Sequence, residues 1–228
     1  MMKLSNETVG VLKNFSAINS NIVIQNGDTI RTISEAKNIL AKAKVQESFE
    51  TGFGIYDLNE FLSAYSMFKD PDIVISGDNT CATIKEGKSS VKYFFSDPSI
   101  LTSPAKDLQL PSVDVSFKLS QDDMASIRRA SSALGVSDVV IIGEAGQPGA
   151  VIRVTDHRDS TANSYELELD NVQRSDESFK VVFDIANFKF LPSAYTVEIS
   201  SKLVSKFSNE DSTLEYFVAL EKSSNFGG

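Results

Sequence analysis

KLSNETVGVLKNFSAIN at residues 3–19 returns in altered form as KLSQDDMASIRRASSAL at residues 118–134. Both stretches begin Lys-Leu-Ser, carry an acid two residues after the serine and place a basic residue, Lys13 or Arg128, ten positions after the lysine. A fixed offset of 115 between them indicates that one structural unit is used twice, and such a repeat decides how every other segment is interpreted.

Three further pairs of segments support the repeat, and they follow in the same order with offsets of 127, 124 and 123. They are IYDLNEFL (55–62) with VFDIANFK (182–189), DIVIS (72–76) with TVEIS (196–200), and KYFFS (92–96) with EYFVA (215–219). Four pairs in one order are not expected by chance. The sequence therefore predicts two copies of one unit, with insertions and deletions between the paired segments.

The second copy resolves an ambiguous segment of the first. Residues 34–45, SEAKNILAKAKV, have helical propensity, but their counterpart at 150–172 alternates apolar and polar residues on both sides of a polar turn. We therefore predict a hairpin in both copies. IVIQNG (22–27) and VVIIGE (139–144) are predicted first strands, and GEAGQPGA (143–150) is a predicted strand-to-strand turn, since it lacks the GK[ST] of a phosphate-binding loop.

Each repeated KLS stretch predicts a helix with one apolar side, capped by Ser5 or Ser120. In the first helix the apolar half holds Leu4, Val9, Val11, Leu12, Phe15 and Ile18. The opposite stripe holds Lys3, Asn6, Gly10, Lys13, Asn14 and Ala17, and its counterpart holds Lys118, Gln121, Ala125, Arg128, Arg129 and Ser132. Two interpretations stay open: the basic residues solvate the helices, or they contact phosphates without reading bases.

Composition excludes several classes of site. The net charge is −9, and one cysteine (Cys81) and one histidine (His157) leave no internal disulfide and no Cys/His zinc site. Cys81 is interpreted as a small buried residue and His157 as part of a solvated hairpin turn. The chain has no long apolar run, and its first residues lack the apolar core of a secretory signal.

Residues 96–114 contain Pro98, Pro104 and Pro111 and predict an extended connector between the copies. The expected organisation is therefore a first domain at 1–100, a connector at 101–114 and a second domain at 115–228. Apolar residues in or beside the connector could lie against the surface. They are Ile100, Leu101, Leu108 and Leu110.

At this point the chain resembles a known family. KLS…LKNFSAIN, IYDLNEFL, YFFSDPS before the connector and FVALE near the end are similar to the sliding clamp of T-even-type bacteriophages, the DNA polymerase processivity factor. The resemblance covers essentially the whole chain in order. Its most specific parts are the first KLS and the YDLN-FL stretch.

The resemblance implies an α+β chain with two tandem clamp-type domains, each with two helices packed on antiparallel sheets, and a homotrimeric ring around duplex DNA. It implies no cofactor, no metal and no catalysis. The implied partners are duplex DNA, the DNA polymerase, a clamp-loader ATPase and a sigma-like late transcription factor, in the cytoplasm of an infected bacterium. The candidate DNA-facing residues, carried over by position, are Lys3, Lys13, Lys118, Arg128, Arg129 and Lys189. The resemblance also implies partner binding near the connector, where the candidates are Ile100, Leu101, Leu108 and Leu110.

Two alternatives to a clamp are considered. A structural or interaction protein of a virion could also be built from duplicated mixed domains, and it would need no basic helix faces. An enzyme could use Asp57 and Asp184, but these acids occupy equivalent positions at the start of two short helices. Helix capping in both copies explains them better than a catalytic pair divided between two domains.

Overall fold

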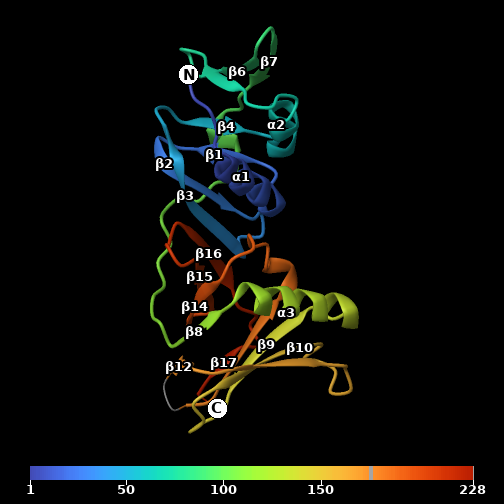
Figure 1. The fold of residues 1–228 in the computed structure, drawn as a ribbon. Coiled ribbons are helices and arrows are strands. Elements are labelled where there is room, and N and C mark those ends of the chain that lie inside the picture. Colours follow the sequence, from blue (N-terminus) through green and yellow to red (C-terminus); the bar gives the residue numbers. More distant parts are fainter. Residues whose placement is uncertain (175–176, 228) are drawn as a thin grey trace. The chain divides into compact units, whose positions relative to one another are not determined.

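The computed structural model describes residues 1–174 and 177–227. The chain divides into two compact units, Met1–Asp107 and Leu108–Gly228 (Figure 1). Residues 101–107 of the expected connector thus belong to the first unit and residues 108–114 to the second. No helix among the described residues is long and apolar enough to cross a bilayer.

Unit 1 combines two helices with short antiparallel sheets. Its helical segments are α1 (Asn6–Ile18), α2 (Leu58–Tyr65) and the 3-10 helix η1 (Pro98–Ile100). Its strands are β1 (Ile22–Ile24), β2 (Gly27–Ile33), β3 (Ile39–Phe49), β4 (Phe53–Ile55), β5 (Asp72–Ile75), β6 (Cys81–Glu86) and β7 (Ser89–Phe94). Antiparallel pairs join β1 to β4, β2 to β3, and β6 to both β5 and β7.

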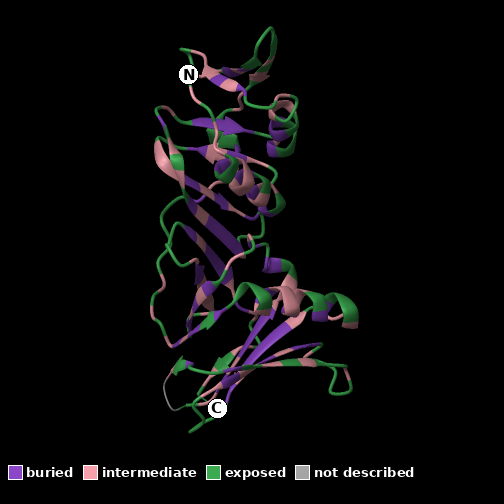
Figure 2. Ribbon diagram, viewed as in Figure 1, coloured by how far each residue is buried: buried purple, intermediate pink, exposed green. Residues whose placement is uncertain are grey.

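Unit 2 contains one long helix, α3 (Gln121–Leu134), and a single 3-10 turn, η2 (Ile185–Asn187). One sheet has the order β11-β10-β9-β13-β17, and β12-β8-β14-β15-β16 are neighbours in another. The strands are β8 (Val115–Leu119), β9 (Asp138–Gly143), β10 (Ala150–Thr155), β11 (Tyr165–Leu169), β12 (Gln173–Arg174), β13 (Phe179–Asp184), β14 (Tyr195–Ser200), β15 (Val204–Ser208), β16 (Leu214–Ala219) and β17 (Asn225–Phe226). Buried residues follow the strands β9, β10 and β13 beside α3 (Figure 2).

Strand register confirms the internal repeat. Met2 forms a β-bridge with Ile73, and Phe117 pairs with Val197 in the second unit. Met2 and Phe117 lie 115 positions apart, and Ile73 and Val197 lie 124 positions apart. These are the offsets already found in the sequence. Ile73 also pairs with Ile84 on its other side, as Val197 does with Phe207. The two copies therefore share strand pairing as well as sequence.

The predicted hairpin in the first copy is confirmed. Residues 34–38 form the turn between β2 and β3, where Ser34 Oγ accepts hydrogen bonds from the N–H groups of Asn38 and Ile39. Lys37 has a φ of 57°, which a helix interior does not allow. The predicted first strands appear as β1 and β9, and residues 144–149 form the expected turn between β9 and β10.

The copies differ at the second helix. Both begin at an aspartate cap: Asp57 Oδ1 accepts from the N–H groups of Asn59 and Glu60, and Asp184 Oδ1 accepts from Ala186 N–H. However, α2 has eight residues, whereas the expected short helix of the second copy is only the 3-10 turn η2. Pro192 stands at the position equivalent to the last residue of α2, Tyr65, and prevents a helix of the same length, because proline lacks an N–H and clashes with the preceding turn.

Candidate nucleic-acid interface

The first predicted helix face is present on α1. Leu12, Phe15 and Ile18 are buried, while Lys13 and Ala17 on the opposite side are exposed. Ser5 caps the helix by accepting from Thr8 N–H at 3.1 Å, as predicted. Lys13 forms no ion pair with any residue that the structure describes, so its ammonium group is available to an anion outside the chain.

The second face is present on α3. Ser120 and Asp123 form a capping box: Ser120 Oγ accepts from Asp123 N–H, and Asp123 Oδ2 accepts from Ser120 N–H. Met124 and Ile127 are buried, as the repeat predicts. Arg129 is exposed on the opposite side, and its Nη2 donates a hydrogen bond to Ser126 Oγ one turn earlier, at 2.8 Å.

Arg128 and Lys189 are brought together, although Arg128 itself is only half-exposed. Its Nη2 donates to the carbonyl oxygens of Phe188 at 2.7 Å and Phe190 at 3.1 Å, on either side of Lys189. Lys189 is exposed. The structure therefore places Arg128, Arg129 and Lys189 around the middle of α3, which sequence alone gave no means of establishing.

Lys118 lies apart from this group. It is exposed on β8, where it lines a cleft of about 550 Å³ together with Asp123, Glu168 and Asp170. Arg128 is seven residues after the first residue of α3, so it lies roughly 10 Å along the helix axis from the helix end that follows Lys118. The acids beside Lys118 make its surroundings mixed in charge rather than basic.

Lys3, the counterpart of Lys118, is engaged by an acid of its own unit. Its ammonium group forms an ion pair with Asp70, and this hydrogen bond raises the pKa of Lys3. Lys3 therefore stays charged, but Asp70 compensates that charge locally. Of the six residues assigned to DNA by position, Lys13, Arg129 and Lys189 are exposed on the sides of the helices or beside them, and Lys13 and Arg129 have no ion pair with a described residue.

The connector residues fall into two groups. Ile100 and Leu108 are exposed, at 71% and 42%, and Leu110 is half-buried. Leu101 is buried against Gly54, where an added Cβ would lie 2.7 Å from Leu101 Cδ1. Leu101 is therefore a core residue of unit 1, and of the four candidate residues Ile100 and Leu108 are the exposed ones. An ion pair between Arg31 and Asp107, at 2.8 Å, fixes the end of this segment to β2.

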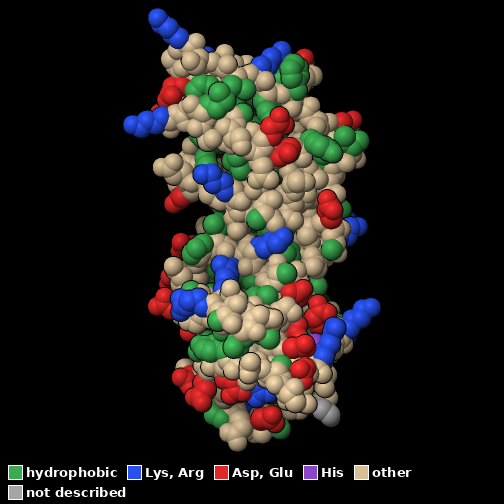
Figure 3. Space-filling model, turned by 90° about the vertical axis from the view of Figure 1, so that its right-hand side faces the viewer, with side chains coloured by type: hydrophobic (Ala, Val, Ile, Leu, Met, Phe, Trp, Pro, Cys, Tyr) green, Lys and Arg blue, Asp and Glu red, His purple; other side chains and the backbone are tan. Residues whose placement is uncertain are grey.

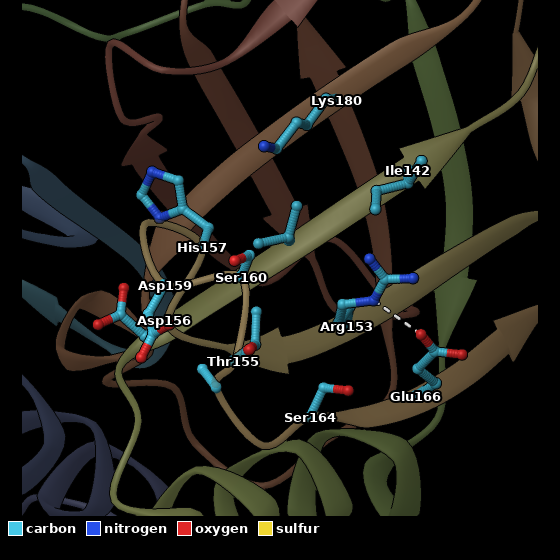
Figure 4. Close-up of a pocket in the computed structure, with 12 residues that line it drawn as sticks. Ile142, Arg153, Thr155, Asp156, His157, Asp159, Ser160, Ser164, Glu166 and Lys180 are labelled. Atoms are coloured by element: carbon cyan, nitrogen blue, oxygen red, sulfur yellow. Dashed lines mark hydrogen bonds and ion pairs between the residues drawn. The ribbon is translucent and has the colours of Figure 1, made fainter.

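The turn around His157 holds the chain's one histidine next to two aspartates. The turn itself is as predicted, but its expected solvation is wrong: the His157 side chain is only 10% exposed, because Nδ1 lies 2.5 Å from Asp138 Oδ2. Asp138, Asp156 and His157 could each offer a ligand atom to a metal. Asp156 instead accepts from Arg158 N–H, and Figure 4 shows the Lys180 side chain directed toward the His157 ring. Interactions within the turn therefore account for the three side chains, and Lys180 lines the same hollow as Asp156 and His157.

Beside this turn is a hollow of about 360 Å³ in unit 2, lined by side chains of both charges. Arg153 is bonded to Glu166 at 2.7 Å, as Figure 4 shows. Figure 3 shows the same mixture elsewhere on unit 2, where basic side chains are interspersed with acidic ones. The basic residues form separate contacts rather than a continuous patch, which suits weak phosphate binding.

Sequence reasoning missed three side chains that shape the interface. Glu47, on β3, accepts hydrogen bonds from Ser5 N–H and the Thr8 hydroxyl at the start of α1. Tyr195 and Tyr216 bind the backbone of Leu191, beside Lys189. Each of these contacts joins residues at least four positions apart in the sequence. The position of a residue in a strand does not predict such contacts.

Family models match both units. A model described as "DNA polymerase processivity factor" matches residues 5–100, and one described as "gp45 sliding clamp, C terminal" matches residues 116–222. The sliding clamp of Vibrio phage KVP40 is 30% identical over 230 residues, covering 96% of this chain and 99% of the relative. The chain is a member of the sliding-clamp family. The sliding clamp of Escherichia phage RB69 is 29% identical, with 98% of each chain covered.

Solved clamps share the fold at much lower identity. The structure of A. fulgidus PCNA bound to the C-terminal region of FEN-1 superposes with a TM-score of 0.70 at 14% identity, covering 95% of this chain and 96% of that one. The Helicobacter pylori beta clamp bound to a DNA ligase peptide gives 0.69 at 16% identity, with 96% of this chain covered. The present chain covers 66% of the Helicobacter pylori chain, slightly less than two thirds. The α+β architecture with duplicated units is thus the clamp fold.

Proposed function

We propose that this clamp closes as a homotrimeric ring around duplex DNA and holds the replicative DNA polymerase on its template. The observation that carries the proposal is the pair of equivalent helices, α1 and α3, whose exposed sides present Lys13 and Arg129 among small or uncharged residues. Such sides suit contact with phosphates of any sequence. The chain's role is topological and involves no catalysis of its own.

Weak binding is an advantage for a ring that must slide. Each phosphate contact adds affinity that falls as salt rises, and few contacts leave the ring free to move. A net charge of −9 keeps the remaining surface unattractive to DNA, so contact is favoured only where the basic residues lie.

Partners would bind at the exposed apolar part of the connector. Two solved clamps are bound to a DNA ligase peptide and to the C-terminal region of FEN-1, which supports peptide docking as a mode available to this fold. Ile100 and Leu108 offer apolar side chains for it. The partners we propose are the DNA polymerase, a clamp-loader ATPase and a sigma-like late transcription factor, in the cytoplasm of an infected bacterium.

Charge reversal tests the DNA-facing surface. The double variant Lys13→Glu, Arg129→Glu should lose at least tenfold in retention on nicked circular DNA after loading, because attraction becomes repulsion at two contacts per chain. The control, Lys202→Glu with Lys222→Glu, changes the net charge equally at two exposed residues in unit 2 outside the helices. Equal loss in both variants, or none in the first, would refute the assignment of this surface to DNA.

A further inference from the structure

The segment at 188–191 in unit 2 lacks the backbone bonds of a helix. The equivalent stretch of unit 1 lies in α2, but here the helical geometry ends at Asn187, and Phe188 N–H makes the last bond, to the Ile185 carbonyl. Backbone groups that leave a helix need other partners when they lie near the core. Three side chains from other elements supply them.

Four hydrogen bonds hold this segment. Arg128 of α3 donates to the carbonyls of Phe188 and Phe190, at 2.7 and 3.1 Å. Tyr195 Oη donates to the Leu191 carbonyl at 2.6 Å, and Leu191 N–H donates to Tyr216 Oη at 3.1 Å. The polar groups of an interrupted helix are thus satisfied by one arginine and two tyrosines.

The rings around the segment fix it further. Tyr216 is fully buried, Tyr195 is 2% exposed, and burial raises the pKa of Tyr216 to about 12. The Phe190 ring lies 4.7 Å from the rings of both Phe207 and Tyr216. Phe188 and Phe190 are therefore anchored in the core, and the exposed Lys189 stands between two anchored neighbours.

We propose that Arg128, with Tyr195 and Tyr216, is a positioning residue that holds Lys189 beside α3 for contact with a DNA phosphate. The inference rests on the proposed function and refines it, because Arg128 then serves the interface through the backbone of 188–190 rather than as a phosphate contact. A lysine on a fixed backbone loses less conformational entropy on binding than one on a mobile loop. The truncated second helix of unit 2 thus keeps a defined cationic side chain where a regular helix is absent.

Tyr216→Phe tests the inference without changing any charge. The hydroxyl is buried and cannot touch DNA, so any effect on binding must pass through the segment it holds. The dissociation constant of the full-length protein for a short linear duplex is measured by fluorescence anisotropy between about 50 and 200 mM salt. Each phosphate contact contributes about 0.9 to the slope of log affinity against log salt concentration. Without one contact, the decrease in affinity over this fourfold range of salt should be about 3.5-fold smaller.

We expect Tyr216→Phe to weaken binding about threefold and to flatten the salt dependence in the same direction as Lys189→Gln. In the Lys189→Gln background, Tyr216→Phe should change the affinity by less than about 1.3-fold, because coupled residues do not add. Arg128→Lys, which keeps the charge but loses the forked donor, should resemble Tyr216→Phe. Arg129→Gln is the control and should add fully to Lys189→Gln.

Additive effects of Tyr216→Phe and Lys189→Gln, or wild-type binding by Arg128→Lys, would overturn the positioning role. Tyr195→Phe removes the donor to the Leu191 carbonyl and repeats the test if Tyr216→Phe unfolds on thermal melting. A wild-type protein that is not retained on nicked circular DNA after loading would instead refute the proposed function, so the two failures are distinguishable.

Discussion

At the scale of single residues, the two copies close the same helix end in different ways. In α3 the third residue, Asp123, completes a capping box with Ser120. The equivalent residue of α1 is Thr8, which has no carboxylate, and Glu47 supplies one from β3. The backbone N–H of the capping serine therefore has an acid as its acceptor in both copies. For Ser120 the acid is local, and for Ser5 it lies 42 residues away.

Glu47→Gln should destabilise unit 1 by about 1–2 kcal/mol, because charge-assisted hydrogen bonds to Ser5 N–H and the Thr8 hydroxyl are replaced by neutral ones. Urea unfolding followed by circular dichroism measures the change. Glu50→Gln on the following turn is the matched control, since Glu50 is exposed and contributes only its backbone carbonyl, to Asn26. An equal loss in both variants would contradict the role of Glu47.

The same contact predicts a pH dependence. Burial acts to raise the pKa of Glu47, but the hydrogen bonds from Thr8 and Ser5 outweigh it, and the pKa lies below the usual value of 4.5. The stabilisation is therefore complete above pH 4.5 and is lost as pH falls through the lower, folded-state pKa. In Glu47→Gln the fall of stability below pH 4.5 should be smaller than in the wild type.

At the scale of elements, aspartate caps start both second helices but with different energetic importance. Asp57 receives two N–H bonds and starts eight helical residues, whereas Asp184 receives one and starts a single turn. Asp57→Ala should cost about 1 kcal/mol of unfolding free energy, a typical value for an N-cap, and Asp184→Ala less. Urea unfolding of both variants checks the order, with Asp57→Asn as a control that keeps a capping oxygen. A larger loss for Asp184→Ala would contradict it.

Elements with a periodic pattern or a counterpart in the other copy could be predicted from the sequence. The hairpin at 34–45 is the clearest case, because its own composition favoured a helix and only the second copy showed the alternation. The length of η2 could not be predicted by the same route. The repeat predicts a helix as long as α2, although Pro192 stands at the position of its last residue. Proline is a local signal, and it outweighs similarity between copies at that point.

The candidate interface was predictable only in outline. Helix periodicity placed Lys13 and Arg129 on exposed sides, because burial of one face follows from the 3.6-residue repeat. Lys3 and Arg128 lay on the same predicted stripes, yet Asp70 and the carbonyls of Phe188 and Phe190 engage them. Those partners are distant in sequence, and no spacing rule connects them to the helices.

At the scale of the whole molecule, the proposed retention on DNA depends on charge and topology together. The chain carries 22 basic and 31 acidic residues, so it has no general affinity for a polyanion. A protein that holds DNA only through separate lysines and arginines should dissociate readily at physiological salt. A closed ring removes this difficulty, because dissociation then requires opening an interface or reaching a DNA end.

Linearising the DNA tests this argument. Clamps loaded on a nicked circle should stay bound at about 150 mM salt, the ionic strength at which exposed charges are well screened, and should be lost within minutes after a restriction enzyme cuts the circle. Ends blocked by a bound protein should restore retention. Sedimentation must show a trimer of three 24.9 kDa chains, about 75 kDa, under the loading conditions. Retention on unblocked linear DNA would mean that affinity, and not topology, holds the protein, and the few basic contacts on α1 and α3 would then be insufficient to explain it.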